Sequence, residues 1–348
     1  MTNRIKSIEL IRFLLSLLIV IGHFGEFFQF SNEHFSNVAS VFVEFFFILS
    51  GFLMMIHIEN HKEEESSFKY IIHKAKSFFL PLTIVNIVHF IVVCIGNKVN
   101  TIGGILEKLW HFKWEFLLLQ CAGFIKEPQF NMDYLIGPTW YISAMMIAMY
   151  FAFYLAKNHN KIFTEFICPL SILFIYVYVT QRYDNINIGS EFVGPICTAV
   201  LRAFAGICVG VLAYKAYKYL ETKDISKSKF YLILDVVAFI TIPLLIVYAI
   251  WGADDNSIFF TVLFGLIVTL AFTNKTPIAR FFNSLNPKAL GFLGVMSLYV
   301  YLTHWTILMI VVFFFPNLSA PLSALLIILG TVIYSGVLYL ITKKIRNN

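Results

Sequence analysis

Two side chains of different chemistry lie within the first apolar run of the chain, an arginine and a histidine. Arg12 and His23 are 11 residues apart. On a helix, 11 steps of about 100° make three turns plus roughly 20°, so both side chains share one face, about 16 Å apart along the axis. Glu26 lies one turn beyond His23 on that face and is placed to orient the imidazole. A guanidinium is a fixed cation that binds anions, and an imidazole can exchange protons near neutral pH, so both residues are candidates for function.

Further polar groups gather in two later apolar runs. Ser297, Tyr301 and His304 follow one another at steps of four and three, which places them on one stripe of a helix. Trp140 and Tyr141 follow a Gly-Pro break that interrupts another run. Polar side chains are costly inside a bilayer, so each is a candidate for function.

Each of these groups also has a structural explanation. Arg12 can reach the inner headgroups by snorkelling, and His23 can be a hydrogen-bonded packing residue. A polar stripe often holds helices together, and a tryptophan after a break is typical of an interfacial anchor. The roles of the remaining intramembrane polar groups stay open; these groups are Glu44, Asn86, His89, Arg202 and Asp235. Among them, Arg202 and Asp235 are candidates for an interhelical ion pair.

The elements that carry these residues must be membrane-spanning helices, because the chain has too little charge for a water-soluble fold. Of its 348 residues, 59% are hydrophobic and 13% are charged, and soluble domains have about twice that charged fraction. We predict an all-α integral membrane protein in which residues 1–348 form a single polytopic domain. Ten runs reach roughly the 17–25 residues that a span needs; they fall at 8–28, 38–57, 78–96, 135–156, 162–180, 193–214, 230–251, 258–273, 291–315 and 320–342.

One further apolar stretch, residues 105–125, is interrupted by charges and is predicted to be an interfacial or re-entrant helix rather than a span. Basic residues orient the ten spans, because cytoplasmic loops are enriched in them. With the N-terminus inside, inner segments hold 19 of the 26 Lys and Arg residues and outer segments hold five. Both termini are therefore expected in the cytoplasm.

The remaining composition excludes several other kinds of site. The five cysteines are scattered without a CxxC pair, which indicates apolar packing rather than a metal site or a disulfide framework. The net charge of +6 is accounted for by loops that face anionic lipid, so we expect no nucleic acid partner. No P-loop or paired-glycine nucleotide fingerprint is present.

Together these motifs resemble those of acyltransferase family 3, a family of membrane acyltransferases. Arg12 and His23 match the family's R-x10-H pattern. Residues 46–51 read FFILSG and match F-F-x-x-S-G, and residues 297–304 read SLYVYLTH and match S-x-Y-x-Y-L-x-H. The basic stretch 73–76 resembles the family's cationic loop, and Trp140 resembles the opening residue of its fourth motif. The match follows motif order over nearly the whole chain.

Two departures from the family pattern point to a divergent branch, similar to bacterial sugar O-acetylases. Met145 stands where many members carry a glutamate, five residues after the motif tryptophan. The cationic stretch uses His and Lys where relatives carry pairs of arginines.

The resemblance implies transfer of an acyl group, most often acetyl, from cytoplasmic acyl-CoA to a hydroxyl of a cell-envelope polysaccharide or lipid-linked sugar, in a bacterial cytoplasmic membrane. No permanently bound cofactor or metal is expected, and a homo-oligomer is compatible with the sequence. In this interpretation His23 is the base and Glu26 its partner. The donor-binding residues are then Arg12, Lys74 and Lys76, and the further site-lining residues are Ser50, Trp140, Tyr301 and His304.

Two other functional classes fit the sequence. A secondary transporter would use intramembrane charges and broken helices near Gly137-Pro138 and Pro195, although the two halves show no internal repeat. A non-catalytic subunit for polysaccharide export or assembly would need no chemistry of its own. The acyl content of the glycan separates an enzyme from both alternatives.

Overall fold

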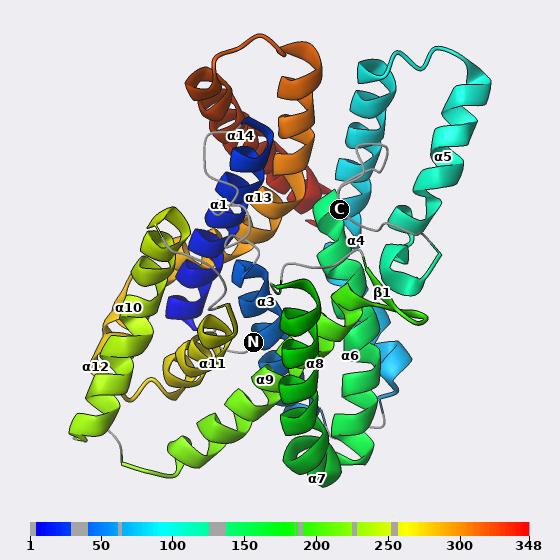
Figure 1. The fold of residues 1–348 in the computed structure, drawn as a ribbon. Coiled ribbons are helices and arrows are strands. Elements are labelled where there is room, and N and C mark those ends of the chain that lie inside the picture. The colour runs from blue at the N-terminus through cyan, green and yellow to red at the C-terminus, as the bar shows by residue number, and fades with distance from the viewer. Residues whose placement is uncertain are drawn as a thin grey trace.

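The computed structural model describes residues 5–28, 41–61, 65–124, 137–184, 186, 191–224, 228–251 and 257–347, and these are almost entirely helical (Figure 1). The first half contains α1 (Lys6–Phe28), α3 (Val41–Asn60), α4 (Ser67–Gly96), α5 (Ile102–Phe116), the 3-10 turns η1 (Gln120–Ala122) and η2 (Gly137–Thr139), and α6 (Trp140–Asn158). The middle contains α7 (Asn160–Ile162), the π-helical turn η3 (Phe163–Ile167), α8 (Cys168–Tyr183), and the antiparallel two-residue strands β1 (Phe192–Val193) and β2 (Ile196–Cys197). The last part contains α9 (Thr198–Glu221), α10 (Lys229–Trp251), α11 (Ser257–Thr273), α12 (Pro277–Ser284), α13 (Pro287–Phe314) and α14 (Ala320–Asn347).

The prediction of an all-α membrane protein is confirmed. Within the described residues, seven helices are long and apolar enough to cross a membrane, or eight if the bent pair Ile258–Thr273 and Pro277–Ser284 is one span. Helices occupy all ten predicted runs, since α1 and α10 cover the other two. Each of those has 23 residues, and 23 residues rise about 34 Å. The total of ten spans and the cytoplasmic placement of both termini stay predictions.

The stretch predicted to be interfacial or re-entrant begins as α5, which has only 15 residues. At 1.5 Å per residue it is about 22 Å long, too short to cross the hydrocarbon core. Lys113 lies 2.8 Å from the ring centroid of Trp110, an arrangement suited to a water–lipid boundary.

Large apolar side chains cover much of the outer surface, as lipid-facing helices require. Only 22% of the most apolar 18-residue stretch of α14 is buried inside the protein. Ile333 and Leu340 of α14 and Phe230 of α10 are each more than 60% exposed. In water such a surface would promote aggregation, whereas in a bilayer it contacts lipid tails at little cost.

Helix α3 lies at the centre of the bundle and packs along α9, where two glycines let the backbones touch. A Cβ atom on Gly51 would lie 2.2 Å from the carbonyl oxygen of Ile207, and one on Gly210 would lie 2.0 Å from that of Ile48. Any larger residue would push the helices apart. The glycine of the FFILSG motif therefore has a packing role, distinct from the serine before it.

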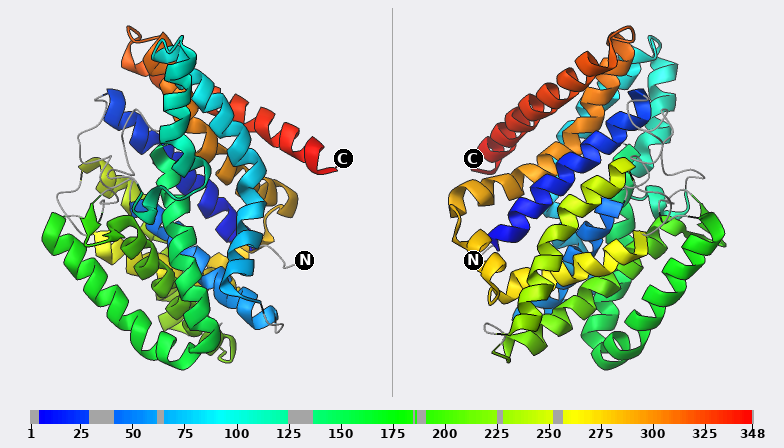
Figure 2. Two further views of the ribbon diagram at one scale, coloured as in Figure 1. Left: turned by 90° about the vertical axis from the view of Figure 1, so that its right-hand side faces the viewer. Right: turned by 60° about the vertical axis from the view of Figure 1, so that its left-hand side comes forward.

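Helix α1 runs alongside α13, so the helix that carries Arg12 and His23 lies against the helix that carries Tyr301 and His304 (Figure 2). The start of α1 is fixed to α12: Lys6 Nζ donates to the backbone oxygen of Asn283 at 2.5 Å, and the backbone N–H of Ser7 donates to Asn283 Oδ1 at 3.1 Å. The two predicted polar stripes consequently face one another.

Candidate active site

A cavity of about 240 Å³ opens between α1, α3, α4, α6 and α13, and it gathers several of the predicted site residues. Its walls are mainly apolar, with a few convergent polar groups, as is typical of ligand pockets. The polar lining consists of Arg12, Ser50, Lys74, Ser77, Tyr141, Ser297 and Tyr301. Four of these were predicted from the sequence as donor-binding or site-lining residues, namely Arg12, Ser50, Lys74 and Tyr301.

Two cations from different helices meet at this cavity. Arg12 Nη1 donates to Glu9 Oε2 at 3.1 Å, and the Arg12 side chain keeps 29% of its surface exposed. Lys74 lines the same cavity from α4. That helix begins at Ser67, where the Ser66 side chain accepts a hydrogen bond from the Lys69 backbone N–H. Lys74 is therefore held on a helix rather than in the loop that we expected, and the cavity is suited to an anion.

The middle of the cavity holds two hydroxyls with one weak acceptor. Ser50 Oγ donates to the Met145 thioether at 3.2 Å, and the Tyr141 hydroxyl donates to the same sulfur at 3.4 Å. A thioether is a poor hydrogen-bond acceptor. Both hydroxyls can therefore turn to a ligand at little cost, which a glutamate at position 145 would have opposed.

Tyr301 lines the end of the cavity that is nearer to the two histidines. Its hydroxyl donates to the backbone oxygen of Pro138, in the turn that precedes α6. The rings of Tyr301 and Tyr141 are 6.0 Å apart in a T-shaped arrangement. The lining reaches Ile19 on α1 and Tyr301 on α13, about one helical turn short of His23 and His304.

Beyond Tyr301 the two histidines form a stacked pair. The ring centroids of His23 and His304 are 5.4 Å apart with an interplanar angle of 19°, and the Trp305 ring meets His23 edge-on. His304 Nδ1 lies 2.7 Å from the backbone oxygen of Tyr301, so this nitrogen carries the proton and donates it. The other nitrogen, Nε2, then has a lone pair, and it is buried without a hydrogen-bond partner among the described residues. A neutral imidazole held in this tautomer can accept a proton.

Besides His23 and His304, two predicted site residues lie outside the cavity lining. Lys76 is exposed on α4, outside the lining. Trp140 points elsewhere, with the Arg202 guanidinium 5.5 Å from its ring centroid. Glu26 lies in α1, but its side chain is outside the part of the chain that the structure describes, so its partnership with His23 stays a prediction.

Three residues of the site were not assigned from the sequence. Tyr141 is adjacent to the predicted Trp140, and successive helical residues point about 100° apart, so the sequence could not tell which of the two enters the cavity. Met145 was noted only as a departure from a family pattern. Glu9 lies three residues before Arg12, a spacing that permits an ion pair and was the one available signal.

Arg202 forms an ion pair with Glu44, not with Asp235. Arg202 Nη2 and Nε lie 2.9 and 3.0 Å from Glu44 Oε1, and the Tyr176 hydroxyl donates to Glu44 Oε2 at 2.7 Å. Both charged side chains are fully buried. With the Trp140 ring against Arg202, this network joins α3, α6, α8 and α9, and it supports the helices that carry Ser50 and Tyr141.

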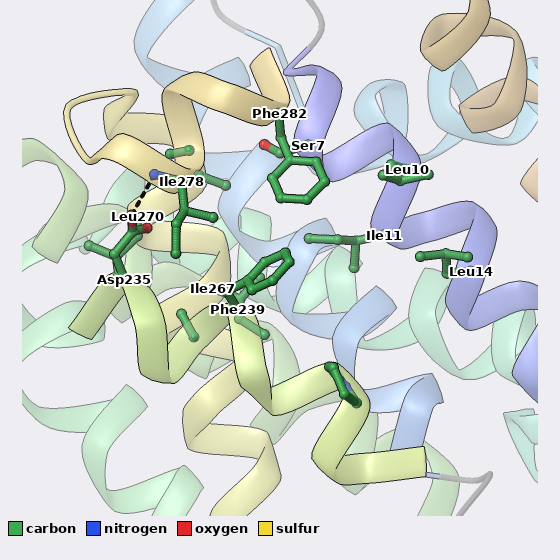
Figure 3. A pocket seen from close by; sticks show the side chains of 14 residues that line it. Ser7, Leu10, Ile11, Leu14, Asp235, Phe239, Ile267, Leu270, Ile278 and Phe282 are labelled. Atoms are coloured by element: carbon green, nitrogen blue, oxygen red, sulfur yellow. Dashed lines mark hydrogen bonds between the residues drawn. The ribbon is translucent and has the colours of Figure 1, made fainter. Parts of the chain in front are cut away.

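Asp235 instead caps a helix beside a second cavity, of about 320 Å³, between α1, α10, α11 and α12. Asp235 Oδ2 accepts the Ile278 backbone N–H at 2.8 Å, at the first turn of α12 (Figure 3). The other walls are almost wholly apolar, including Ile11 and Leu14 of α1. Asp235 thus fixes α12, and this cavity brings no candidate catalytic groups together.

His89 has a structural contact as well, because its Nδ1 lies 3.1 Å from Thr306 Oγ1 and joins α4 to α13. In the described ranges no three His, Cys, Asp or Glu side chains come close enough to hold a metal ion. Among the described residues, the candidate groups for chemistry are the cavity lined by Arg12 and Lys74 and the histidine pair.

Replacing Tyr301 by phenylalanine should lower the free energy of unfolding by about 1–2 kcal/mol, because the Pro138 carbonyl loses its buried donor. Thermal unfolding of the purified protein in detergent measures this loss. Tyr334→Phe is the matched control, since the Tyr334 hydroxyl is buried with no hydrogen-bond partner among the described residues and its removal should cost nothing. Equal stability of Tyr301→Phe and the parent protein would show that Tyr301 is not anchored at this end of the cavity.

Comparison with known proteins places these features in context. A family model described as an acyltransferase domain matches residues 5–340, nearly the whole chain. No curated protein and no solved structure matches the chain significantly.

Proposed function

This chain belongs to acyltransferase family 3, and from that premise we propose that it moves an acyl group from cytoplasmic acyl-CoA to a hydroxyl of a cell-envelope polysaccharide or lipid-linked sugar. The acyl group is acetyl in this proposal, and the setting is a bacterial cytoplasmic membrane. The observation that carries the proposal is the placement of a two-cation cavity one helical turn from a stacked pair of imidazoles.

The cations suit the donor. Acyl-CoA is strongly anionic through its phosphates, and an arginine fork binds such groups with two parallel hydrogen bonds. Arg12 and Lys74 are the charged groups of the cavity that are placed to do so. Because α1 links Arg12 to His23 along one face, a donor held at Arg12 can direct its long pantetheine arm along α1 towards the histidines.

The histidine pair suits the chemical step. A sugar hydroxyl is a weak nucleophile, so a base must take its proton while its oxygen bonds to the acyl carbon. We assign this role to His23, with the His304 ring stacked beside it. The carbon–sulfur bond then breaks, and the proton held by the imidazole passes to the CoA thiolate as it leaves. Transfer in this scheme is direct, without an acyl group resting on the protein.

Charge develops on the carbonyl oxygen during this step and needs donors aimed at it. The Ser50 and Tyr141 hydroxyls are available because their present acceptor is the weak Met145 thioether. The scheme requires no resident metal or cofactor, since acyl-CoA and the glycan supply every atom that is exchanged.

Incubation of membranes with acetyl-CoA labelled in the acetyl group tests the proposal. We expect the label to appear in a covalent ester of a glycan or lipid-linked sugar, identified by mass spectrometry. Arg12→Ala should reduce labelling at least tenfold at low acetyl-CoA, because a charged hydrogen bond to the donor is lost. The amount of protein in the membrane should be unchanged, and Lys69→Ala, an exposed change on α4, is the control for general effects of charge.

Other results would point to the rival functions. Labelled solute that accumulates in vesicles without forming an ester would indicate a transporter. Loss of the whole polymer in a deletion strain, with no change in its acylation when made, would indicate an assembly or export subunit. Normal labelling by Arg12→Ala would refute the assignment of Arg12 to the donor.

A further inference from the structure

A recess in α13 receives the carboxylate of α1 that is bonded to Arg12. Glu9 is buried to 7% exposure, and the start of its helix is fixed by the bonds from Lys6 and Ser7 to Asn283. Its side chain reaches Gly294 of α13, where an added Cβ would lie 1.4 Å from Glu9 Oε2 and 2.4 Å from its Cδ. Only glycine leaves this space. The same Oε2 atom accepts the hydrogen bond from Arg12 Nη1.

We propose that Glu9 is a positioning residue that holds the Arg12 guanidinium in the cavity, and that Gly294 provides the recess in which the Glu9 carboxylate is kept. This inference rests on the proposed function, in which Arg12 binds the donor. Glu9 touches no part of the donor itself. It acts by deciding where the guanidinium points.

A guanidinium near the end of a membrane helix has another place to go, which is the layer of inner headgroups. Its long side chain has about 2 kcal/mol of rotamer entropy to lose when it is held in one geometry. Glu9 occupies one edge of the guanidinium and leaves the rest facing the cavity, where Lys74 and Ser297 also lie. An ion pair formed before the donor arrives therefore lowers the cost of donor binding.

The surrounding bonds indicate that this arrangement is built into the helix crossing. Ser297 Oγ donates to the backbone oxygen of Gly294 at 2.8 Å, which fixes the serine of the SLYVYLTH segment beside the recess. One turn earlier on α13, a Cβ on Gly291 would meet no atom of the described residues within 4 Å. The requirement for glycine is thus local to the point where Glu9 enters.

The test compares two substitutions that disturb one contact from opposite sides. Glu9→Gln keeps the shape and removes the charge, whereas Gly294→Ala keeps the charge and displaces the carboxylate. We expect each to raise the KM for acyl-CoA about tenfold with a smaller fall in kcat. Glu9→Asp, which retains the charge, should recover part of the affinity. CoA binding by calorimetry on the purified full-length variants should show the same loss.

Non-additivity distinguishes positioning from general damage. Because both changes act on the Glu9–Arg12 contact, the double variant should have a KM within about twofold of Glu9→Gln alone. Gly291→Ala, the matched glycine change on the same helix, should match the parent protein. Multiplicative effects in the double variant, or an unchanged KM and CoA affinity in Glu9→Gln, would overturn the inference while leaving the proposed function intact. Absence of CoA binding by the parent protein would overturn both.

Discussion

Replacing His23 by glutamine is expected to lower the kcat for acyl transfer by about 10²–10⁴-fold. Glutamine retains a polar side chain of similar size but cannot take a proton from the acceptor hydroxyl. His23 stacks on His304 at 5.4 Å and lies beyond the end of the cation-lined cavity, so the loss should fall on the chemical step. The KM for acyl-CoA should change little. Initial rates with labelled acetyl-CoA, at matched protein levels in the membrane, measure both parameters.

His159→Gln is the matched control for this variant, because His159 is exposed at the end of α6, away from the cavity. It should retain the rate of the parent protein. His304→Gln tests the second imidazole by itself. A fall in kcat similar to that of His23→Gln indicates that the pair acts as one unit. If His23→Gln kept normal kcat while His304→Gln lost activity, the base would be His304, and our assignment of His23 would be wrong.

Much of the fold followed from apolar run length, because a bilayer admits few alternatives. A chain segment in hydrocarbon must satisfy its own backbone hydrogen bonds, so each long apolar run has to be a helix. Helix ends were less predictable. α4 begins at Ser67, well before the apolar run at 78, because a serine cap and several charged residues extend it into the headgroup region. Lys74 therefore lies on the helix, and the rotation of α4 about its own axis places the Lys74 side chain in the cavity lining.

The site was predictable where spacing along one helix was sufficient. The 11-residue step from Arg12 to His23 and the steps from Ser297 to His304 each define a single face. That these faces meet depends on which helices are neighbours, and spacing does not contain this information. The choice between Trp140 and Tyr141 likewise depends on the rotation of α6 about its own axis.

The partner of Arg202 shows the same limit most clearly. The sequence offered Asp235 and Glu44 as buried acids, and no periodicity relates α9 to either of them. Gly206 and Gly210 bring α9 against α3, where a Cβ on Gly206 would lie 3.2 Å from Glu44 Oε2. The close approach of the two helices therefore selects Glu44. Asp235 instead accepts the Ile278 N–H in the first turn of α12, which has no partner within that helix.

Breaking the Glu44–Arg202 pair should destabilise the protein by about 3–5 kcal/mol, the largest stability effect that we expect from any single change here. Glu44→Gln removes the carboxylate that pairs with a fully buried guanidinium, and Arg202→Leu leaves a fully buried carboxylate with the Tyr176 hydroxyl. The double variant Glu44→Gln/Arg202→Leu removes both charges and keeps an acceptor for Tyr176. It should therefore be more stable than either single variant, because the cost arises from the uncompensated charge.

The free energy of unfolding in detergent micelles, for the parent, both single variants and the double variant, measures this coupling. The chain offers a matched control on the same two helices, because Lys218 of α9 lies 3.1 Å from Glu59 of α3 with both side chains largely exposed. Glu59→Gln should cost at most about 1 kcal/mol, since water solvates the charge that remains. Two results would mean that the Arg202 charge is compensated elsewhere. One is an equal loss of unfolding free energy on breaking the buried and the exposed pair. The other is a loss in the double variant equal to the sum of the losses in the two single variants. The supporting frame of Ser50 and Tyr141 would then not depend on this ion pair.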